Sequence, residues 1–267
     1  MTQNNAYLSI LQITDMHILR HSGETLVGID TEHYFHAILE LAFSAPAQFD
    51  LVLMTGDLAQ TPCQASYQRI LNRIEAYPAE YVCLAGNHDD FELMQTILNT
   101  ERVSCRKHTV LGNWQIICLN SQIPGAPGGH LAARELEFLD ACLREHPGCP
   151  ALIAVHHHCQ KTGSVWMDGM MIDNSPEFFA VITKYPEVKA VICGHIHQAL
   201  DDRAGSVHLL GTPSTCFQFT PGSSHFSVDD AAPGYRVIEL YADGRIKSKI
   251  SRLSVKLTGL KLNGDSY

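Results

Sequence analysis

The sequence predicts an α/β fold, and three observations indicate it. Short apolar runs recur along the chain, segments with helical spacing of apolar residues separate several of them, and Asp, Asn or His residues follow five of the runs within three positions. The five runs are strands expected at residues 7–13, 51–54, 81–84, 150–155 and 188–193. In open α/β sheets, ligands bind beyond the carboxyl ends of the strands. We therefore expect a functional site where these strands end.

Composition limits the class of protein. The 267 residues contain no linker, repeat or low-complexity stretch, so a single domain over residues 1–267 is expected. The net charge is -9 and no basic run occurs, which argues against nucleic acid as a partner. The nine cysteines form no C-x-x-C pair and are expected to be reduced. The N-terminus is not signal-like, and no apolar run approaches the roughly 20 residues of a membrane span, so we expect a cytoplasmic protein without membrane contact. The expected oligomeric state is a monomer or a homodimer.

Helices are expected where apolar residues recur with helical spacing. The first covers residues 30–41, with Asp30 or Thr31 as its N-cap. Others are expected at residues 66–76, 133–144 and 175–184, and one more begins at Phe91. The 30 residues from Asp57 to Asn87 match one β-α-β crossover, which returns the second strand parallel to the first. These two polar residues should therefore lie side by side.

The remaining elements are hairpins and loops. Residues 108–120 indicate a hairpin about Gly112 and Asn113, and residues 235–241 should pair with 245–250. Another strand is expected at residues 207–210, and loops at 161–171 and 212–219.

Two acidic residues and an amide follow the first three strands. Asp15 and His17 come after residues 7–13, and alternation along a strand would point both to the same side. Asp57 follows Gly56, which permits a tight turn and a close backbone approach. Asn87 follows residues 81–84. Each feature alone is also ordinary turn chemistry.

Histidines follow the last two strands. His156 is the first of three consecutive histidines after residues 150–155 and is the expected inward ligand. Its neighbours His157 and His158 either orient it or are polar loop residues, and the sequence favours neither. His195 and His197 follow residues 188–193, and alternation again places them on one face.

The combined set of side chains is typical of a metal site. It comprises seven residues: Asp15, His17, Asp57, Asn87, His156, His195 and His197. Mixed oxygen and nitrogen ligands favour Mn, Fe or Zn over Ca²⁺, and the absence of cysteine argues against a closed structural zinc site. Seven ligands exceed the needs of one ion but suit two ions about 3.5–4 Å apart, bridged by a carboxylate.

The ordered motifs D-x-H, G-D, G-N-H-D, H-H and G-H-x-H resemble those of the calcineurin-like metallophosphoesterases. More specifically, residues 11–15, 55–60, 156–158, 193–198, 212–216 and 232–236 are similar to the bacterial class III cyclic-AMP phosphodiesterases. The similarity covers nearly the whole chain. The sequence differs from these relatives at Cys159, where they often have proline, and at Asp90, which stands between Asp89 and Phe91. Neither residue is at a ligand position.

The resemblance implies a fold and a ligand assignment. The fold would be a four-layer αββα sandwich of two mixed β-sheets flanked by helices. Two metal ions are implied, with Fe or Mn expected and Zn as an alternative. One ion would take Asp15, His17, Asp57 and His197, and the other Asp57, Asn87, His156 and His195. Asp57 would bridge them.

The implied reaction is hydrolysis of 3′,5′-cyclic AMP to 5′-AMP by a hydroxide that bridges the metals. Asn87 and His88 are the candidate catalytic residues: Asn87 would help to hold the phosphoryl oxygens, and His88 would protonate the leaving oxygen. The candidate substrate-binding residues are His17, Asp57, Asn87, His88 and His197. Trp166, Met167 and Phe219 are chemically suitable walls for a nucleoside.

Three other functions remain open at this point. The same chemistry could serve another phosphodiester, a phosphomonoester or a pyrophosphate. A non-catalytic interaction protein on this fold is disfavoured because every ligand type is present. A metal-dependent amidohydrolase would have its H-x-H pair early in the chain, whereas here it comes late.

Overall fold

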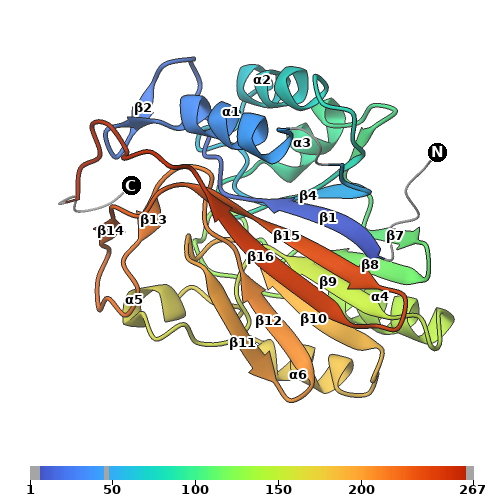
Figure 1. Ribbon diagram of the computed structural model, residues 1–267. Coiled ribbons are helices and arrows are strands. Elements are labelled where there is room, and N and C mark those ends of the chain that lie inside the picture. Colours follow the sequence, from blue (N-terminus) through green and yellow to red (C-terminus); the bar gives the residue numbers. More distant parts are fainter. Residues whose placement is uncertain (1–6, 45–47, 263–267) are drawn as a thin grey trace.

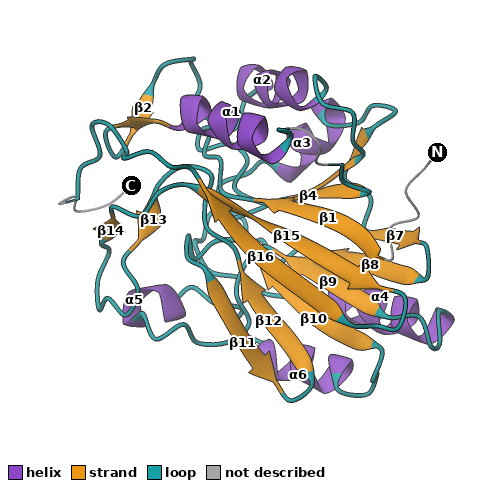
Figure 2. Ribbon diagram, in the orientation of Figure 1, coloured by secondary structure: helices purple, strands orange, loops and turns teal. Residues whose placement is uncertain are grey.

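The computed structural model describes residues 7–44 and 48–262. Two six-stranded sheets lie face to face, and helices cover the outer face of each (Figures 1 and 2). This is the four-layer αββα sandwich that the resemblance implies.

The first sheet combines parallel and antiparallel strands. Its order is β16 (Ile246–Arg252), β15 (Gly234–Tyr241), β1 (Tyr7–Ile13), β4 (Leu51–Thr55), β5 (Tyr81–Leu84) and β6 (Val103–Ser104). Strands β1, β4, β5 and β6 run parallel, whereas β15 is antiparallel to both β1 and β16. Its outer face carries α1 (Thr31–Ala42), α2 (Gln64–Ile74) and α3 (Phe91–Ile97).

The second sheet is also mixed. Its order is β11 (Leu200–Ala204), β12 (Val207–Gly211), β10 (Val188–Cys193), β9 (Ala151–Val155), β8 (Trp114–Leu119) and β7 (His108–Leu111). The edge strands β11 and β7 are antiparallel to their neighbours, and the four central strands are parallel. Helices α4 (Ala133–Glu145) and α6 (Ser175–Ile182) cover its outer face. Smaller elements are α5 (Val165–Asp168), β2 (Thr25–Leu26), β3 (Ile29–Asp30), β13 (Gln218–Phe219) and β14 (Val228–Asp229).

Apolar side chains fill the space between all four layers. Between the sheets, Ile10 and Leu53 of the first sheet belong to one buried cluster with Leu152 and Ile192 of the second. Separate clusters lie between each sheet and its helices. Because burial of apolar area stabilises all three interfaces, the sheets are held face to face and their strand ends meet along one edge.

The expected strands, helices and hairpins are present, with boundaries that differ by a few residues. Asp30 caps α1, as one of two candidates predicted, and accepts a hydrogen bond from the backbone N–H of His33 at 3.0 Å. Strand β11 was not predicted, because its Asp201, Asp202 and Arg203 give no apolar run. The predicted loop at 161–171 contains the short helix α5. In the described part of the chain, no helix is long and apolar enough to cross a membrane.

Candidate metal centre

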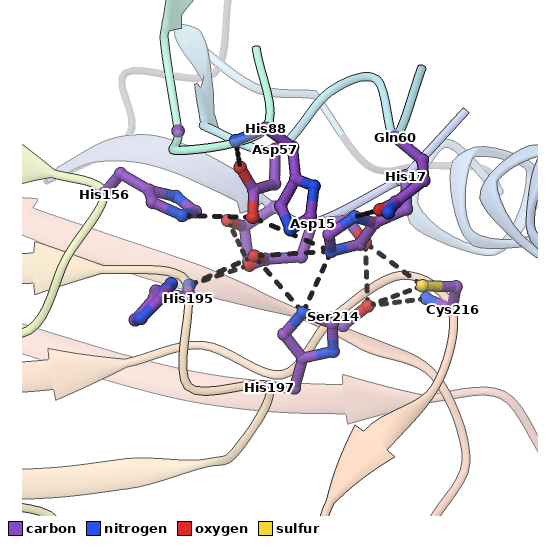
Figure 3. A network of polar contacts seen from close by, with 12 residues as sticks. Asp15, His17, Asp57, Gln60, His88, His156, His195, His197, Ser214 and Cys216 are labelled. Atoms are coloured by element: carbon purple, nitrogen blue, oxygen red, sulfur yellow. Dashed lines mark hydrogen bonds and ion pairs between the residues drawn. The ribbon is translucent and has the colours of Figure 1, made fainter. Parts of the chain in front are cut away.

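All seven predicted ligands lie where strands of the two sheets end. Figure 3 labels all of them except Asn87. The first sheet supplies Asp15 and His17 after β1, Asp57 after β4 and Asn87 after β5; the second supplies His156 after β9 and His195 and His197 after β10. Six of them are at most 1% exposed, and Asn87 is partly exposed. The cluster is therefore shared between the sheets and is closed to solvent except on the side of Asn87 and the similarly exposed His88.

The backbone of these residues is unusual. The strands end at Ile13 and Cys193, so strand alternation is the wrong explanation for the pairs Asp15/His17 and His195/His197. Instead, five candidate ligands have left-handed backbones, with φ of 55° at Asp15, 49° at His17, 50° at Asp57, 66° at His195 and 46° at His197. Among the described residues, Val27 is the one other non-glycine residue with positive φ. Such conformations cost free energy and concentrate at functional sites, where the surrounding structure holds them.

Glycines let the loops approach closely. A Cβ at Gly56, which has φ of 95°, would lie 2.3 Å from His156 Nδ1, and one at Gly86 would lie 2.1 Å from Asp57 Oδ1. A Cβ at Gly194 would lie 2.0 Å from Oγ1 of Thr14, which follows β1 of the other sheet. Side chains at these positions would push the candidate ligands apart.

One group of ligands converges around His17. His17 Nε2 and His197 Nε2 are 3.1 Å apart, and His197 Nε2 is 3.3 Å from Asp15 Oδ1. Asp57 Oδ2 lies 3.8 Å from His17 Nε2. Four donor atoms thus point into one small space, as metal ligands do.

A second group converges around His156. Its Nε2 is 3.3 Å from Asp57 Oδ2 and 3.2 Å from Asn87 Oδ1. The other oxygen, Asp57 Oδ1, accepts a hydrogen bond from the backbone N–H of His88 at 2.9 Å. Asp57 is therefore in contact with both groups.

Three imidazoles are oriented by oxygen atoms outside the cluster. The pairs are His17 Nδ1 with Gln60 Oε1 at 2.7 Å, His156 Nδ1 with the Thr55 carbonyl at 2.9 Å, and His197 Nδ1 with the Phe217 carbonyl at 2.8 Å. Because these oxygens accept hydrogen bonds, Nδ1 of each ring carries a proton and Nε2 faces the cluster. The sequence did not identify these partners, although Gln60 lies in the stretch 55–60 that carries the resemblance.

His195 packs against His157 and His158, the two histidines whose role the sequence left open. Its ring centroid is 4.6 Å from that of His157 and 5.8 Å from that of His158. His157 Nδ1 is 2.7 Å from Ser121 Oγ, and His158 Nε2 is 3.7 Å from Asp168 Oδ1. Both are at most 2% exposed, so neither is a solvated loop residue. No described residue forms a hydrogen bond with either ring nitrogen of His195, although the residue is buried, as expected of a ligand.

Charges in the cluster also fit a cation. Burial would raise the pKa of Asp57, but the nearby histidines together, His156 above all, hold that pKa well below 3.8. Burial would lower the pKa of His156, but the charges of Asp57 and Asp15, with hydrogen bonds to Asp57 and the Thr55 carbonyl, together raise it to about 9. Burial lowers the pKa of His17 to about 3 and that of His195 well below 6.5, so both imidazoles are neutral and can donate a lone pair. The donor set thus fits metal ions, and its two groups around Asp57 indicate a dinuclear site.

Of the three residues predicted to line a nucleoside pocket, two are fully buried. Met167 and Phe219 are 0% exposed, so Met167 belongs to the core. Phe219 stacks on His197 with centroids 4.2 Å apart, and Trp166 packs edge-on against Phe219 at 5.0 Å. Phe219 therefore packs against His197, and Trp166 packs against Phe219.

The chain is similar in sequence to a known protein family and to individual phosphodiesterases. The family model for calcineurin-like phosphoesterases matches residues 8–199. A 3′,5′-cyclic-nucleotide phosphodiesterase of Nostoc sp. is 41% identical over 94% of this chain and 94% of its own length. The 3′,5′-cyclic adenosine monophosphate phosphodiesterase CpdA of Escherichia coli is 40% identical over 93% of this chain and 91% of its own, and that of Pseudomonas aeruginosa is 37% identical over the same shares.

Solved structures share the fold. A dimetal phosphatase from Danio rerio superposes with a TM-score of 0.63 at 13% identity, covering 94% of this chain and 99% of its own. A phosphatase from Mycoplasma pneumoniae gives a TM-score of 0.55 at 12% identity, covering 94% of each chain.

Proposed function

This chain belongs to the calcineurin-like phosphoesterase family, and we propose that it is a metal-dependent phosphodiesterase that hydrolyses 3′,5′-cyclic AMP to 5′-AMP. The observation that carries the proposal is the position of Asp57, whose carboxylate contacts the ligand groups of both His17 and His156. The names of the relatives at 37–41% identity support the substrate.

The chain would hold two ions on seven side chains. One would take Asp15, His17, Asp57 and His197, and the other Asp57, Asn87, His156 and His195. Imidazole nitrogens mixed with carboxylate and amide oxygens suit Fe or Mn, with Zn as the alternative. When bound, such ions supply positive charge to the phosphoryl oxygens and activate water for attack on phosphorus.

The residues of the chain would orient the substrate and complete the proton transfer. The amide of Asn87, in contact with His156, would hold a phosphoryl oxygen. His88 is partly exposed, its ring centroid lies 5.1 Å from that of His17, and its backbone is bound to Asp57. It would protonate the departing 3′ oxygen, because that oxygen gains charge as its bond to phosphorus breaks.

A substrate panel tests this proposal. The purified protein, loaded in turn with Mn²⁺ and Fe²⁺, is given 3′,5′-cyclic AMP, 2′,3′-cyclic AMP and bis(p-nitrophenyl) phosphate, and the products are identified by chromatography. We expect metal-dependent release of 5′-AMP from the 3′,5′ isomer. Activity confined to the other two substrates would reject cyclic AMP but keep the dinuclear chemistry. No activity with any metal would reject the enzyme itself.

A further inference from the structure

A chain of buried polar side chains crosses the apolar interface between the two sheets. Gln12 is on β1, and Arg236 is its direct partner on the neighbouring strand β15. Thr212 follows β12 in the other sheet. All three are at most 2% exposed, and the surrounding inter-sheet cluster is apolar.

The amide of Gln12 links the sheets directly. Its Nε2 donates to Thr55 Oγ1 of the first sheet at 3.0 Å and to the Cys193 carbonyl of the second at 3.1 Å. Its Oε1 accepts a hydrogen bond from Thr212 Oγ1 at 2.6 Å. The Cys193 carbonyl can only accept, which fixes the orientation of the amide.

Arg236 is at the other end of this row of hydrogen-bonded side chains. Its Nε donates to Thr212 Oγ1 at 3.3 Å, and Nη1 donates to Ser248 Oγ at 2.7 Å. Nη2 donates to the carbonyls of Leu200 and Gly211, both in the second sheet, at 2.9 Å each. A buried guanidinium is costly unless its donors are satisfied, so sliding one sheet over the other would break several directional bonds at once.

The network lies immediately beneath the candidate ligands. Gln12 precedes Asp15 by three residues, Thr55 precedes Asp57 by two, and Cys193 precedes His195 by two. The tight contact of Gly194 with Thr14 lies between the network and the ligands. The stretches 212–216 and 232–236, which carry the resemblance but hold no predicted ligand, contribute Thr212 and Arg236.

We infer that Gln12 is a positioning residue that sets the distance between the ligands of the first sheet and those of the second, with Thr212 and Arg236 holding its amide. The inference rests on the proposed dinuclear function. Apolar contacts permit small shifts between sheets, whereas a hydrogen-bonded amide specifies one register. Sub-ångström shifts would matter because Asp57 would hold both ions.

The test compares Gln12→Met with Gln115→Met. Gln115 is also a fully buried amide, donating to the Cys149 carbonyl at 3.3 Å, but it lies near the start of β8, at the end of the sheet opposite His156. Both variants keep the side-chain length and lose amide hydrogen bonds. Binding of Mn²⁺ to the metal-free proteins is titrated by calorimetry, and spin coupling of the bound ions is recorded by electron paramagnetic resonance.

We expect Gln12→Met to bind the second Mn²⁺ at least tenfold more weakly and to show an altered coupled spectrum, while Gln115→Met matches the wild type in both. Wild-type affinity and spectrum in Gln12→Met would overturn the inference and leave the proposed function standing. A wild-type protein that binds fewer than two ions would overturn both. If Gln12→Met does not fold, Thr212→Val replaces the hydroxyl that bonds to Gln12 and Arg236 with a methyl group and is judged by the same two readouts.

Discussion

His156 Nε2 lies 3.3 Å from Asp57 Oδ2, although the two residues follow strands of different sheets. Each sheet alone carries an incomplete set of ligands, so packing of the two sheets assembles the site. Asp57 is the side chain at which the two halves meet, so we expect its mutation to affect both.

Asp57→Asn should abolish the dinuclear site. The amide removes a buried negative charge that contacts His17 and His156, so at most one metal ion should remain bound. We expect kcat/KM for cyclic AMP to fall by about a thousandfold or more, since metal activation of water would be lost. Metal content by mass spectrometry and steady-state kinetics measure this. The control is Asp243→Asn, which removes an exposed carboxylate paired with Arg245 and should change neither value.

His88→Ala should separate metal binding from turnover. The backbone N–H that binds Asp57 remains, so two ions should still bind. Loss of the proton donor should lower kcat by about 10²–10⁴-fold. His130→Ala, at an exposed histidine paired with Asp173, is the matched control. A near wild-type kcat in His88→Ala would show that the leaving oxygen is protonated by another group.

Gly86→Ala should displace Asp57. The new methyl group would lie 2.1 Å from Asp57 Oδ1 and must push the carboxylate away, so metal content and activity should both fall. Overpacking of this kind costs about 1–3 kcal/mol of unfolding free energy. Gly128→Ala, whose methyl group would meet nothing nearer than 3.6 Å, should behave as the wild type. Equal metal content in the two variants would contradict the tight approach of these loops.

Tyr67→Phe should reduce stability through the loop that carries Asn87. The Tyr67 hydroxyl donates to Asp89 Oδ1 at 3.0 Å and accepts from the Asp90 N–H at 3.0 Å. Asp89 in turn accepts from backbone N–H groups of residues 58, 59 and 86, which ties the loops after β4 and β5 together. Loss of the hydrogen bond to the buried Asp89 carboxylate and of the one from the Asp90 N–H should cost about 1–3 kcal/mol, measured by urea denaturation.

The control for this stability measurement is Tyr185→Phe. That hydroxyl bonds to Asp140 at 2.9 Å at a partly exposed position, and its loss should cost less than about 1 kcal/mol. If Tyr67→Phe lost no more unfolding free energy than Tyr185→Phe, the hydrogen bond from Tyr67 would not be needed to hold Asp89 in place.

The sequence indicated where the site lies, because the ends of parallel strands meet at one edge. It could not show how Asp15 and His17 reach the site, because both lie beyond the end of β1 and have left-handed backbones that strand alternation does not describe. Nor could it pair His197 with the Phe217 carbonyl or Gln12 with Thr212, because these contacts join segments that only the packed sheets bring together. The single domain over residues 1–267, the monomeric or dimeric state and the cytoplasmic location stay predictions.

The most direct test of the dinuclear site is a crystal structure of the Mn²⁺-loaded protein with anomalous difference maps recorded at the manganese edge. We predict two peaks about 3.5–4 Å apart, with a carboxylate oxygen of Asp57 bound to both. A single peak, or two peaks with Asp57 bound to neither, would contradict the account.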